Sequence, residues 1–268
     1  MKYFAGCDVG STTGKAVVLD ETGKILAYAI LPSTTDPEVT ATESLKNALA
    51  KLDIVYLIDG VPDIKNITRI VGTGYGRIEL TFAHENVSEI TCHAIGAHFL
   101  DPTIRTVIDI GGQDCKAMSL KDDGHVLDFV MNDKCAAGTG RFFEGMGRAF
   151  GMNIEEFSRL SLGSNNPTPI SSQCSVFAES EVISLISQRK PAADIAAGIQ
   201  KAVAKRTLGL VRKVGIVEKL TVTGGCFKNV GLIKAIEQGL NGISVATLPF
   251  DAQMVGALGA AVLAMRKK

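Results

Sequence analysis

Tryptophan, long apolar runs and net charge are all missing from this chain of 268 residues. No stretch of 18 consecutive apolar residues occurs, so the sequence predicts no membrane-spanning helix. The 28 basic and 28 acidic residues cancel, so no overall field would draw the chain to nucleic acid or to an anionic membrane. Asp8 stands too early for a signal peptide, and we therefore expect a cytoplasmic protein.

Closely spaced cysteines are also missing. The chain has six cysteines, and they lie singly at positions 7, 92, 115, 135, 174 and 226. Without a Cys-x-x-Cys pair, one chain offers neither a zinc knuckle nor a thioredoxin-like centre. The scattered spacing is not that of a small secreted disulfide protein, and it favours a reducing compartment.

The two commonest nucleotide-binding motifs do not occur either. The chain contains neither G-x-x-x-x-G-K-[ST] nor G-x-G-x-x-G, which argues against P-loop and Rossmann sites. Three other glycine turns follow apolar strands instead: DVGSTTGK (8–15), IDIGGQD (108–114) and VTGGC (222–226). Glycines let backbone N–H groups approach a phosphate closely. One such turn is common in hairpins, but three at strand ends predict a nucleotide site.

The opening pattern of the chain is repeated about a hundred residues later. FAGCDVGSTTGKAVVLDETGKILAYAI and IRTVIDIGGQDCKAMSLKDDGHVLDFVMND both predict a strand, an acidic-glycine turn, a strand, a charged turn and a third strand. Helices are predicted over 37–52 and 87–100 and through most of 136–213, and a last strand is predicted over 243–249. We therefore expect an α/β protein built by duplication of a unit in which helices follow a β-meander.

The three glycine turns, in this order, resemble the first phosphate loop, second phosphate loop and adenosine loop of the actin, sugar-kinase and heat-shock-chaperone ATPase superfamily. The resemblance implies two duplicated ribonuclease-H-like lobes, the actin-like ATPase fold, with Mg-ATP in the cleft between them. Lobe I would comprise 1–96 and 252–268, and lobe II would comprise 97–251.

The turns also assign roles to individual residues. Asp8 and Asp109 are expected to hold Mg²⁺ through water. Gln113 or Asp114 is expected to orient the attacking water. The residues expected to bind phosphate oxygens are Gly10, Ser11, Thr12, Thr13, Lys15, Gly111 and Gly112. The residues expected near the adenosine are Gly224 and Gly225, with Gln253 as a further nucleotide candidate.

Two cysteines each precede a run that is typical of a helix: Cys135 in NDKCAAGTGRFFE and Cys174 in SSQCSVFAESEVISLIS. The N–H groups at a helix start would favour a thiolate there. Three interpretations stay open, which are buried packing, a disulfide that a reducing compartment disfavours, and metal ligation. Two thiolates complete neither a tetrahedral zinc site nor a [4Fe–4S] cluster, so ligation would need the second pair that a two-fold dimer supplies. The other four cysteines are expected to pack in the core.

The segments MNDKCAAGTGRF and SSQCSVFAESEV resemble the cluster-binding segments of the 2-hydroxyacyl-CoA dehydratase activators, whose close relatives are the ATPase subunits of benzoyl-CoA reductases. The likeness runs along the whole chain, through GCDVGSTTGK, GTGYGR, SEITCHAIGA, VIDIGGQD, VTGG and GALGAA. The resemblance implies that Cys135 and Cys174 from each of two subunits hold one [4Fe–4S] cluster in a homodimer.

The same resemblance implies the function of an ATP-dependent, one-electron donor in an anaerobic reaction. A ferredoxin or flavodoxin would reduce the cluster, and MgATP hydrolysis would drive the electron to a partner iron–sulfur enzyme such as a 2-hydroxyacyl-CoA dehydratase or a reductase. The alternatives are a small-molecule kinase of the same fold, in which the cysteines only pack, and a non-catalytic ATP-binding sensor. A kinase would need a substrate-binding insertion, for which 268 residues leave little room.

Overall fold

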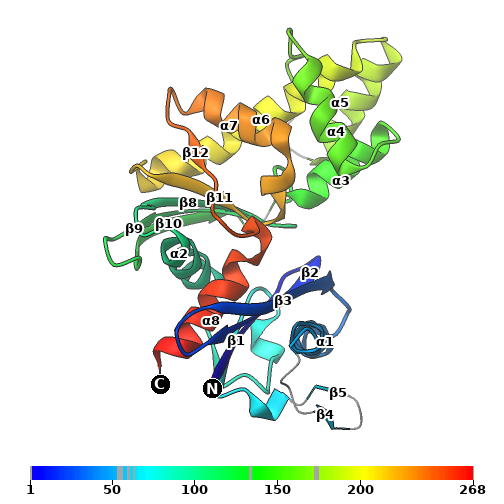
Figure 1. Ribbon diagram of the computed structural model, residues 1–268. Coiled ribbons are helices and arrows are strands. Elements are labelled where there is room, and N and C mark those ends of the chain that lie inside the picture. Colours follow the sequence, from blue (N-terminus) through cyan, green and yellow to red (C-terminus); the bar gives the residue numbers. More distant parts are fainter. Residues whose placement is uncertain are drawn as a thin grey trace. The chain divides into compact units, whose positions relative to one another are not determined.

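The computed structural model of the protein describes residues 2–52, 57–58, 61–62, 64–132, 135–171 and 175–267 (Figure 1). The chain divides into two compact units. Unit 1 comprises Met1–Arg105, Leu120–Leu127 and Leu248–Lys268, and unit 2 comprises Thr106–Ser119 and Asp128–Thr247. Among the described residues, no helix combines the length and the apolar character needed to span a membrane.

Unit 1 contains a five-stranded sheet in the order β3-β2-β1-β6-β7. Its strands are β1 (Tyr3–Val9), β2 (Thr13–Asp20), β3 (Ile25–Pro32), β6 (Arg69–Thr73) and β7 (Glu85–Asn86). The first three form the predicted antiparallel meander, and β6 and β7 continue the sheet in parallel. Almost every residue of β1 and β2 is buried, which is typical of strands covered on both faces. In a separate two-stranded sheet, β4 (Leu57–Ile58) pairs with β5 (Val61–Pro62) in an antiparallel arrangement.

The helices of unit 1 are α1 (Pro37–Leu49), α2 (Glu89–Leu100) and α8 (Val255–Arg266). Alternate residues of β2 face opposite sides of the sheet: Val18 packs in the cluster that contains α1, whereas Val17 packs against α8 and α2. The Asp36 carboxylate caps α1 by accepting hydrogen bonds from two backbone N–H groups of its first turn. The helix ends at Leu49, three residues before the predicted end.

Glycines bring α8 unusually close to its neighbours in unit 1. A Cβ atom at Gly6 on β1 would overlap the backbone of Ala257, and a Cβ at Gly259 would overlap the carbonyl of Cys92 on α2. Because these side chains are absent, the first turns of α8 lie directly against β1 and α2.

Unit 2 contains most of a second five-stranded sheet, in the order β10-β9-β8-β11-β12. Its strands are β8 (Thr106–Ile110), β9 (Cys115–Leu120), β10 (Val126–Asn132), β11 (Leu220–Thr223) and β12 (Val245–Ala246). The pairing of β8 with β9 is antiparallel, and β11 and β12 are parallel to β8. This is the strand order of the first sheet, which confirms the predicted duplication. The strand predicted over 243–249 contracts to the two residues of β12.

The helices of unit 2 are α3 (Gly140–Ala149), α4 (Ile154–Leu160), α5 (Ser175–Ser187), α6 (Ala192–Val214) and α7 (Val230–Gly239). Figure 1 shows α6 and α7 side by side, and α3, α4 and α5 grouped together. The apolar stripe predicted on α6 is fully buried, at Ile195, Ile199, Val203, Leu208 and Val211. Gly215, with φ of +78°, lies just after α6, where a left-handed residue ends helices well. Single turns of 3-10 helix occur at Ile64–Asn66, Arg77–Glu79, Ser161–Gly163, Gly225–Lys228 and Ala252–Met254.

Candidate functional site

The first predicted phosphate loop lies in unit 1, at the turn between β1 and β2. Asp8 and Lys15 are cross-strand partners below this turn, and both are buried. Lys15 Nζ lies 3.3 Å from Asp8 Oδ2 and donates to the Thr13 carbonyl at 3.1 Å. The Gly10 N–H donates to the same carbonyl at 3.0 Å, which closes the turn. A carboxylate and an ammonium group are therefore fixed directly beneath the tip of the loop.

The tip itself consists of partly buried residues. Ser11, Thr12 and Thr13 are all half-buried, and Thr13 begins β2. Ser33, just after β3, holds the tip in place: its N–H donates to the Thr12 carbonyl at 3.0 Å and its hydroxyl donates to the Gly10 carbonyl at 2.8 Å. The carbonyl groups of the turn are thus used within the protein, and its small, hydroxyl-bearing residues lie at the surface.

The second predicted phosphate loop repeats this construction in unit 2. Asp109 and Lys116 are cross-strand partners on β8 and β9, with Lys116 Nζ 3.5 Å from Asp109 Oδ2. The N–H of Gly111 donates to the Asp114 carbonyl at 3.0 Å. In the first loop, the N–H of Gly10 likewise donates to the carbonyl three residues later. Lys116 Nζ also lies 2.8 Å from Asp114 Oδ1. The two candidates for orienting water therefore differ, since Asp114 is paired with a buried lysine whereas Gln113 is exposed.

The third glycine turn meets the second within unit 2. Thr223 at the end of β11 donates to Asp109 Oδ1 at 3.1 Å. Gly224 is buried with φ of +85°, and a Cβ there would lie 2.7 Å from Asp109 Oδ1. Gly225 is exposed at the start of the following 3-10 turn. The predicted adenosine loop is thus in contact with the carboxylate of the predicted second phosphate loop.

The turn before α3 joins the same cluster of loops. The N–H of Gly140 donates to the Gly111 carbonyl at 2.9 Å, and that of Arg141 donates to the Gly112 carbonyl at 3.0 Å. Gly138, with φ of +97°, packs against Val203 of α6. The segment that follows Cys135 therefore connects the glycine turn of β8 to helix α6.

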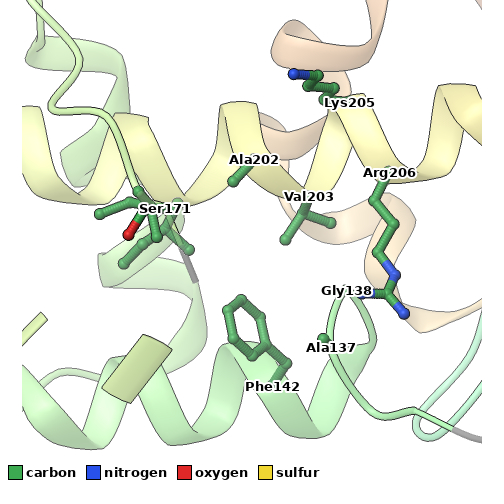
Figure 2. A pocket seen from close by; sticks show the side chains of 10 residues that line it. Ala137, Gly138, Phe142, Ser171, Ala202, Val203, Lys205 and Arg206 are labelled. Carbon is green, nitrogen blue, oxygen red and sulfur yellow. The ribbon is translucent and has the colours of Figure 1, made fainter. Parts of the chain in front are cut away.

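A cavity of about 530 Å³ opens beside this segment. Figure 2 shows Phe142 directed from α3 toward Ala202 and Val203 of α6, and Arg206 directed from α6 toward Gly138. The cavity is lined by Ala137, Gly138, Phe142, Ile170, Ser171, Ile199, Ala202, Val203, Lys205 and Arg206. Its lining is mainly apolar, with two cationic side chains, a composition that suits a flat, partly apolar anion.

The sequence did not predict Lys205 and Arg206 as site residues. They lie between Val203 and Leu208 of the buried stripe on α6. A pair of basic residues on a helix is usually solvated. The pair becomes informative only when α3 and the loop at 170–171 are placed opposite it. Gln253 was predicted, and it lies in unit 1 in the 3-10 turn before α8, where its N–H donates to Asp251 Oδ1 at 2.9 Å.

The five cysteines that the structure describes fall into two environments. Four are buried, namely Cys7, Cys92, Cys115 and Cys226, which confirms the packing role expected for them. Burial raises the pKa of the Cys7, Cys92 and Cys115 thiols to about 12 and raises the pKa of Cys226 as well. Metal ligation requires a thiolate, so these four thiols are poor ligands.

Cys135 is different because its side chain is only half-buried. It follows the edge strand β10, and its carbonyl accepts a hydrogen bond from Asn132 Nδ2 at 3.1 Å. It lies five positions before Gly140, the first residue of α3. A short turn therefore separates Cys135 from the helix start whose N–H groups were expected to favour its thiolate. Cys174 lies outside the described residues. Within the described part of the chain, no three His, Cys, Asp or Glu side chains converge as a metal site.

Comparison with known proteins gives a matching family model and several close similarities. The model of the BadF/BadG/BcrA/BcrD ATPase family matches residues 5–264. A 2-hydroxyisocaproyl-CoA dehydratase activator from Clostridioides difficile is 42% identical, over 98% of this chain and 94% of that protein.

Two solved structures are equally similar. Component A of the Acidaminococcus fermentans (R)-2-hydroxyglutaryl-CoA dehydratase has a TM-score of 0.91 and 40% identity, covering 100% of this chain and 99% of that one. The activator of the 2-hydroxyisocaproyl-CoA dehydratase from Clostridium difficile, with bound ADPNP, has a TM-score of 0.89 and 39% identity, covering 99% and 95%. These similarities confirm the expected fold and the expected resemblance.

Proposed function

Because this chain belongs to the BadF/BadG/BcrA/BcrD ATPase family, we propose that it is an ATP-dependent, one-electron donor that activates an iron–sulfur partner enzyme such as a 2-hydroxyacyl-CoA dehydratase. Its close relatives are named as dehydratase activators, which favours this function over that of a small-molecule kinase with the same fold. The nucleotide part of the proposal rests on a single observation. A buried aspartate is paired with a buried lysine beneath a glycine turn, and this arrangement occurs once in each unit.

The residues of both turns fit a magnesium nucleotide. Mg²⁺ is usually held by one or two carboxylates together with phosphate oxygens and water, so a dense group of protein ligands is not required. Asp8 and Asp109 would each supply one such carboxylate, and Lys15 and Lys116 keep these carboxylates oriented. When bound, Mg²⁺ would neutralise charge on the phosphates. The small residues at the loop tips would let backbone N–H groups approach the phosphates.

The residues assigned to the phosphates are Gly10, Ser11, Thr12, Thr13 and Lys15 in unit 1 and Gly111 and Gly112 in unit 2. Of the two candidates for orienting water, we infer that Gln113 has this role, because the Asp114 carboxylate is paired with Lys116. Asp114 then fixes the shape of the turn that presents Gln113.

The cavity beside α6 supports a place for the nucleoside. Its apolar lining suits a purine, and Arg206 is directed toward the turn that adjoins the glycine turn of β8. Gly224, which lies against Asp109, and Gly225 add no side chains at the end of β11. Replacing Arg206 by Ala should weaken MgADP binding about 10-fold, as loss of one charged hydrogen bond does. Lys201→Ala, at an exposed position on the same helix, is the matched control and should leave the affinity unchanged.

The cysteines support an iron–sulfur centre shared between two copies of the chain. Cys135 is accessible, whereas the four buried thiols are not suited to ligation. We propose that Cys135 and Cys174 of each subunit together provide the four thiolates that a [4Fe–4S] cluster takes, in a homodimer. The cluster would supply the low-potential electron, which a ferredoxin or flavodoxin would have delivered in a reducing cytoplasm.

The turn between Cys135 and α3 offers a route by which nucleotide binding acts on the cluster ligand. Ala137 and Gly138 line the cavity, and Gly140 is hydrogen-bonded to the glycine turn of β8. Cys135 lies only a few residues away along the chain. A movement of the cavity wall or of the glycine turn would therefore be transmitted to its backbone. ATP and ADP need only differ in their affinity for two positions of this turn to drive such a change.

Two large apolar side chains are exposed on the helix that follows Cys174. Phe177 and Ile183 on α5 are 67% and 52% exposed, respectively, which is high for such large apolar side chains. Their exposure supports a role for α5 in contacts between the two subunits or with the acceptor enzyme.

Purification without oxygen tests the cluster. The wild-type protein should be a brown dimer with about four iron atoms per two chains, as a single [4Fe–4S] cluster requires. Cys135→Ser should lose the iron and keep MgADP binding, whereas Cys115→Ala, at a buried thiol, should keep both. Unchanged iron in Cys135→Ser would refute the ligand assignment, and colourless protein that phosphorylates a metabolite would favour the kinase.

A further inference from the structure

A buried histidine lies beside the Asp8 carboxylate. His93 is on the second turn of α2 and is only 5% exposed. Gly256, in the first turn of α8, has no side chain, and a Cβ there would lie 2.7 Å from His93 Nε2 and 3.0 Å from Asp8 Oδ2. The imidazole nitrogen and the carboxylate oxygen therefore border the same small space.

The surrounding backbone fixes the position of His93. A Cβ at Gly96 on α2 would overlap the Val255 carbonyl, and a Cβ at Gly259 on α8 would overlap the Cys92 carbonyl. The two helices are thus in backbone contact on both sides of the histidine. In a region packed this closely, the ring has little freedom to turn away from Asp8.

Asp8 needs an orienting group besides Lys15. The distance of 3.3 Å from Lys15 Nζ to Asp8 Oδ2 is long for an ammonium and a carboxylate, which usually approach to about 2.7–2.9 Å. The other oxygen, Oδ1, lies against Gly74, where a Cβ would overlap it. Oδ2 therefore faces the lysine and the histidine, and Oδ1 faces a glycine.

In the duplicated unit, a different group orients the corresponding aspartate. Asp109 has Lys116 as its cross-strand partner, and its Oδ1 accepts the hydroxyl of Thr223 at 3.1 Å. Thr73 on β6 occupies the register of Thr223 relative to Asp8. Within the described part of the chain, the Thr73 hydroxyl makes no hydrogen bond to Asp8. The hydroxyl anchor of the second unit is therefore missing from the first, and His93 stands beside the carboxylate instead.

We propose that His93 is a positioning residue for Asp8: its imidazole fixes the rotamer in which the Asp8 carboxylate meets the hydrated Mg²⁺ of a bound nucleotide. The inference rests on the proposed ATPase function. His93 acts only through Asp8 and does not contact the nucleotide.

The test compares two substitutions at this position. His93→Leu keeps the volume and removes both ring nitrogens, whereas His93→Gln keeps an amide near the position of Nε2. Groups that orient a metal ligand typically contribute 10- to 100-fold to metal affinity or activity. We expect His93→Leu to lower kcat for ATP hydrolysis by about that factor and to weaken Mn²⁺ binding in the ADP complex, measured by electron paramagnetic resonance. His93→Gln should recover most of both.

His98→Leu is the matched control, because His98 is on the same helix and its ring lies against Gly124. It should leave kcat and Mn²⁺ affinity unchanged. Equal Mn²⁺ affinity in wild type and His93→Leu would overturn the proposal, as would equal losses in His93→Leu and His93→Gln accompanied by the same fall in melting temperature. A wild-type protein that binds Mn²⁺ and ADP without hydrolysing ATP would overturn the proposed function instead, and the affinity comparison would still decide the role of His93.

Discussion

Lys15 faces Asp8 across β1 and β2, seven residues away along the chain, with Nζ 3.3 Å from Oδ2. The pair of Lys116 and Asp109 has the same separation and the same register across β8 and β9. In both hairpins the lysine comes to lie under the glycine turn because strand pairing fixes its position. Duplication has thus preserved a charge pair together with the turn above it.

Removing the lysine alone should destabilise the protein. Lys15→Met leaves the buried Asp8 carboxylate without its cation, which costs about 3–5 kcal/mol for a buried pair. The double variant Asp8→Asn/Lys15→Met removes both charges and should recover most of this loss without recovering ATP hydrolysis. Urea unfolding and an ATPase assay measure the two effects. Lys46→Met, at an exposed pair with Glu43, is the control, and a Lys15→Met protein as stable as wild type would contradict the prediction.

The thiols should differ sharply in reactivity. A pKa of about 12 leaves on the order of one in ten thousand of the Cys7, Cys92 and Cys115 thiols ionised at pH 8. Iron-free folded protein treated with iodoacetamide at this pH should therefore be modified at Cys135 and protected at these three, as peptide mass spectrometry would detect. Unfolded protein should be modified at every site. Rapid modification of Cys92 in the folded protein would refute the burial argument.

Two glycines in helices should respond oppositely to alanine. Gly259→Ala places a methyl group against the Cys92 carbonyl and should cost about 1–3 kcal/mol, the usual range for overpacking. Gly209→Ala on α6 meets nothing within 4 Å and should stabilise the protein by up to about 1 kcal/mol through helix propensity. Thermal unfolding of both variants measures the difference. A stable Gly259→Ala protein would mean that α2 and α8 separate easily.

The contribution of Glu85 to stability should depend on pH. Lys267, with Nζ 2.6 Å away, and then Arg69 lower the pKa of this carboxyl. A pKa that is lower in the folded state stabilises the protein above the unfolded pKa, and this stabilisation is lost as pH falls through the folded pKa. Glu85→Gln should therefore cost about 0.5–1 kcal/mol at pH 7 and less at pH 3, by urea unfolding. An equal cost at both pH values would exclude an ionic origin.

Much of the fold could be predicted because its signals are local. The glycine turns, the repeated meander and the stripe on α6 each occupy a few consecutive residues or follow a fixed period. Strand ends were harder: the segment at 243–249 has strand propensity, yet only Val245 and Ala246 pair with β11, and the Val245 N–H donates to the side chain of Glu237 at 3.1 Å. A propensity scale does not record how far the neighbouring strand extends.

The sequence could group the residues of the candidate site where one segment carries them, and could not where several segments contribute. Asp8 and Lys15 lie in one hairpin, and the sequence was sufficient to bring them together. Arg206 faces Gly138 from nearly seventy positions later in the chain, and only the packing of α3 against α6 makes that relation visible. The choice between Gln113 and Asp114 likewise depended on where Lys116 places its ammonium group.

The short turn from Cys135 to Gly140 would also transmit an effect from the cysteine to the bound nucleotide. Thermodynamic linkage is reciprocal, so if nucleotide binding changes the affinity of Cys135 for the proposed cluster by some factor, the cluster must change nucleotide affinity by the same factor. If Cys135 holds the proposed cluster, protein from which the iron is removed should discriminate between ATP and ADP differently from the intact form. Under the proposed function, damage to the cluster by oxygen would impair the response to nucleotide as well as electron transfer.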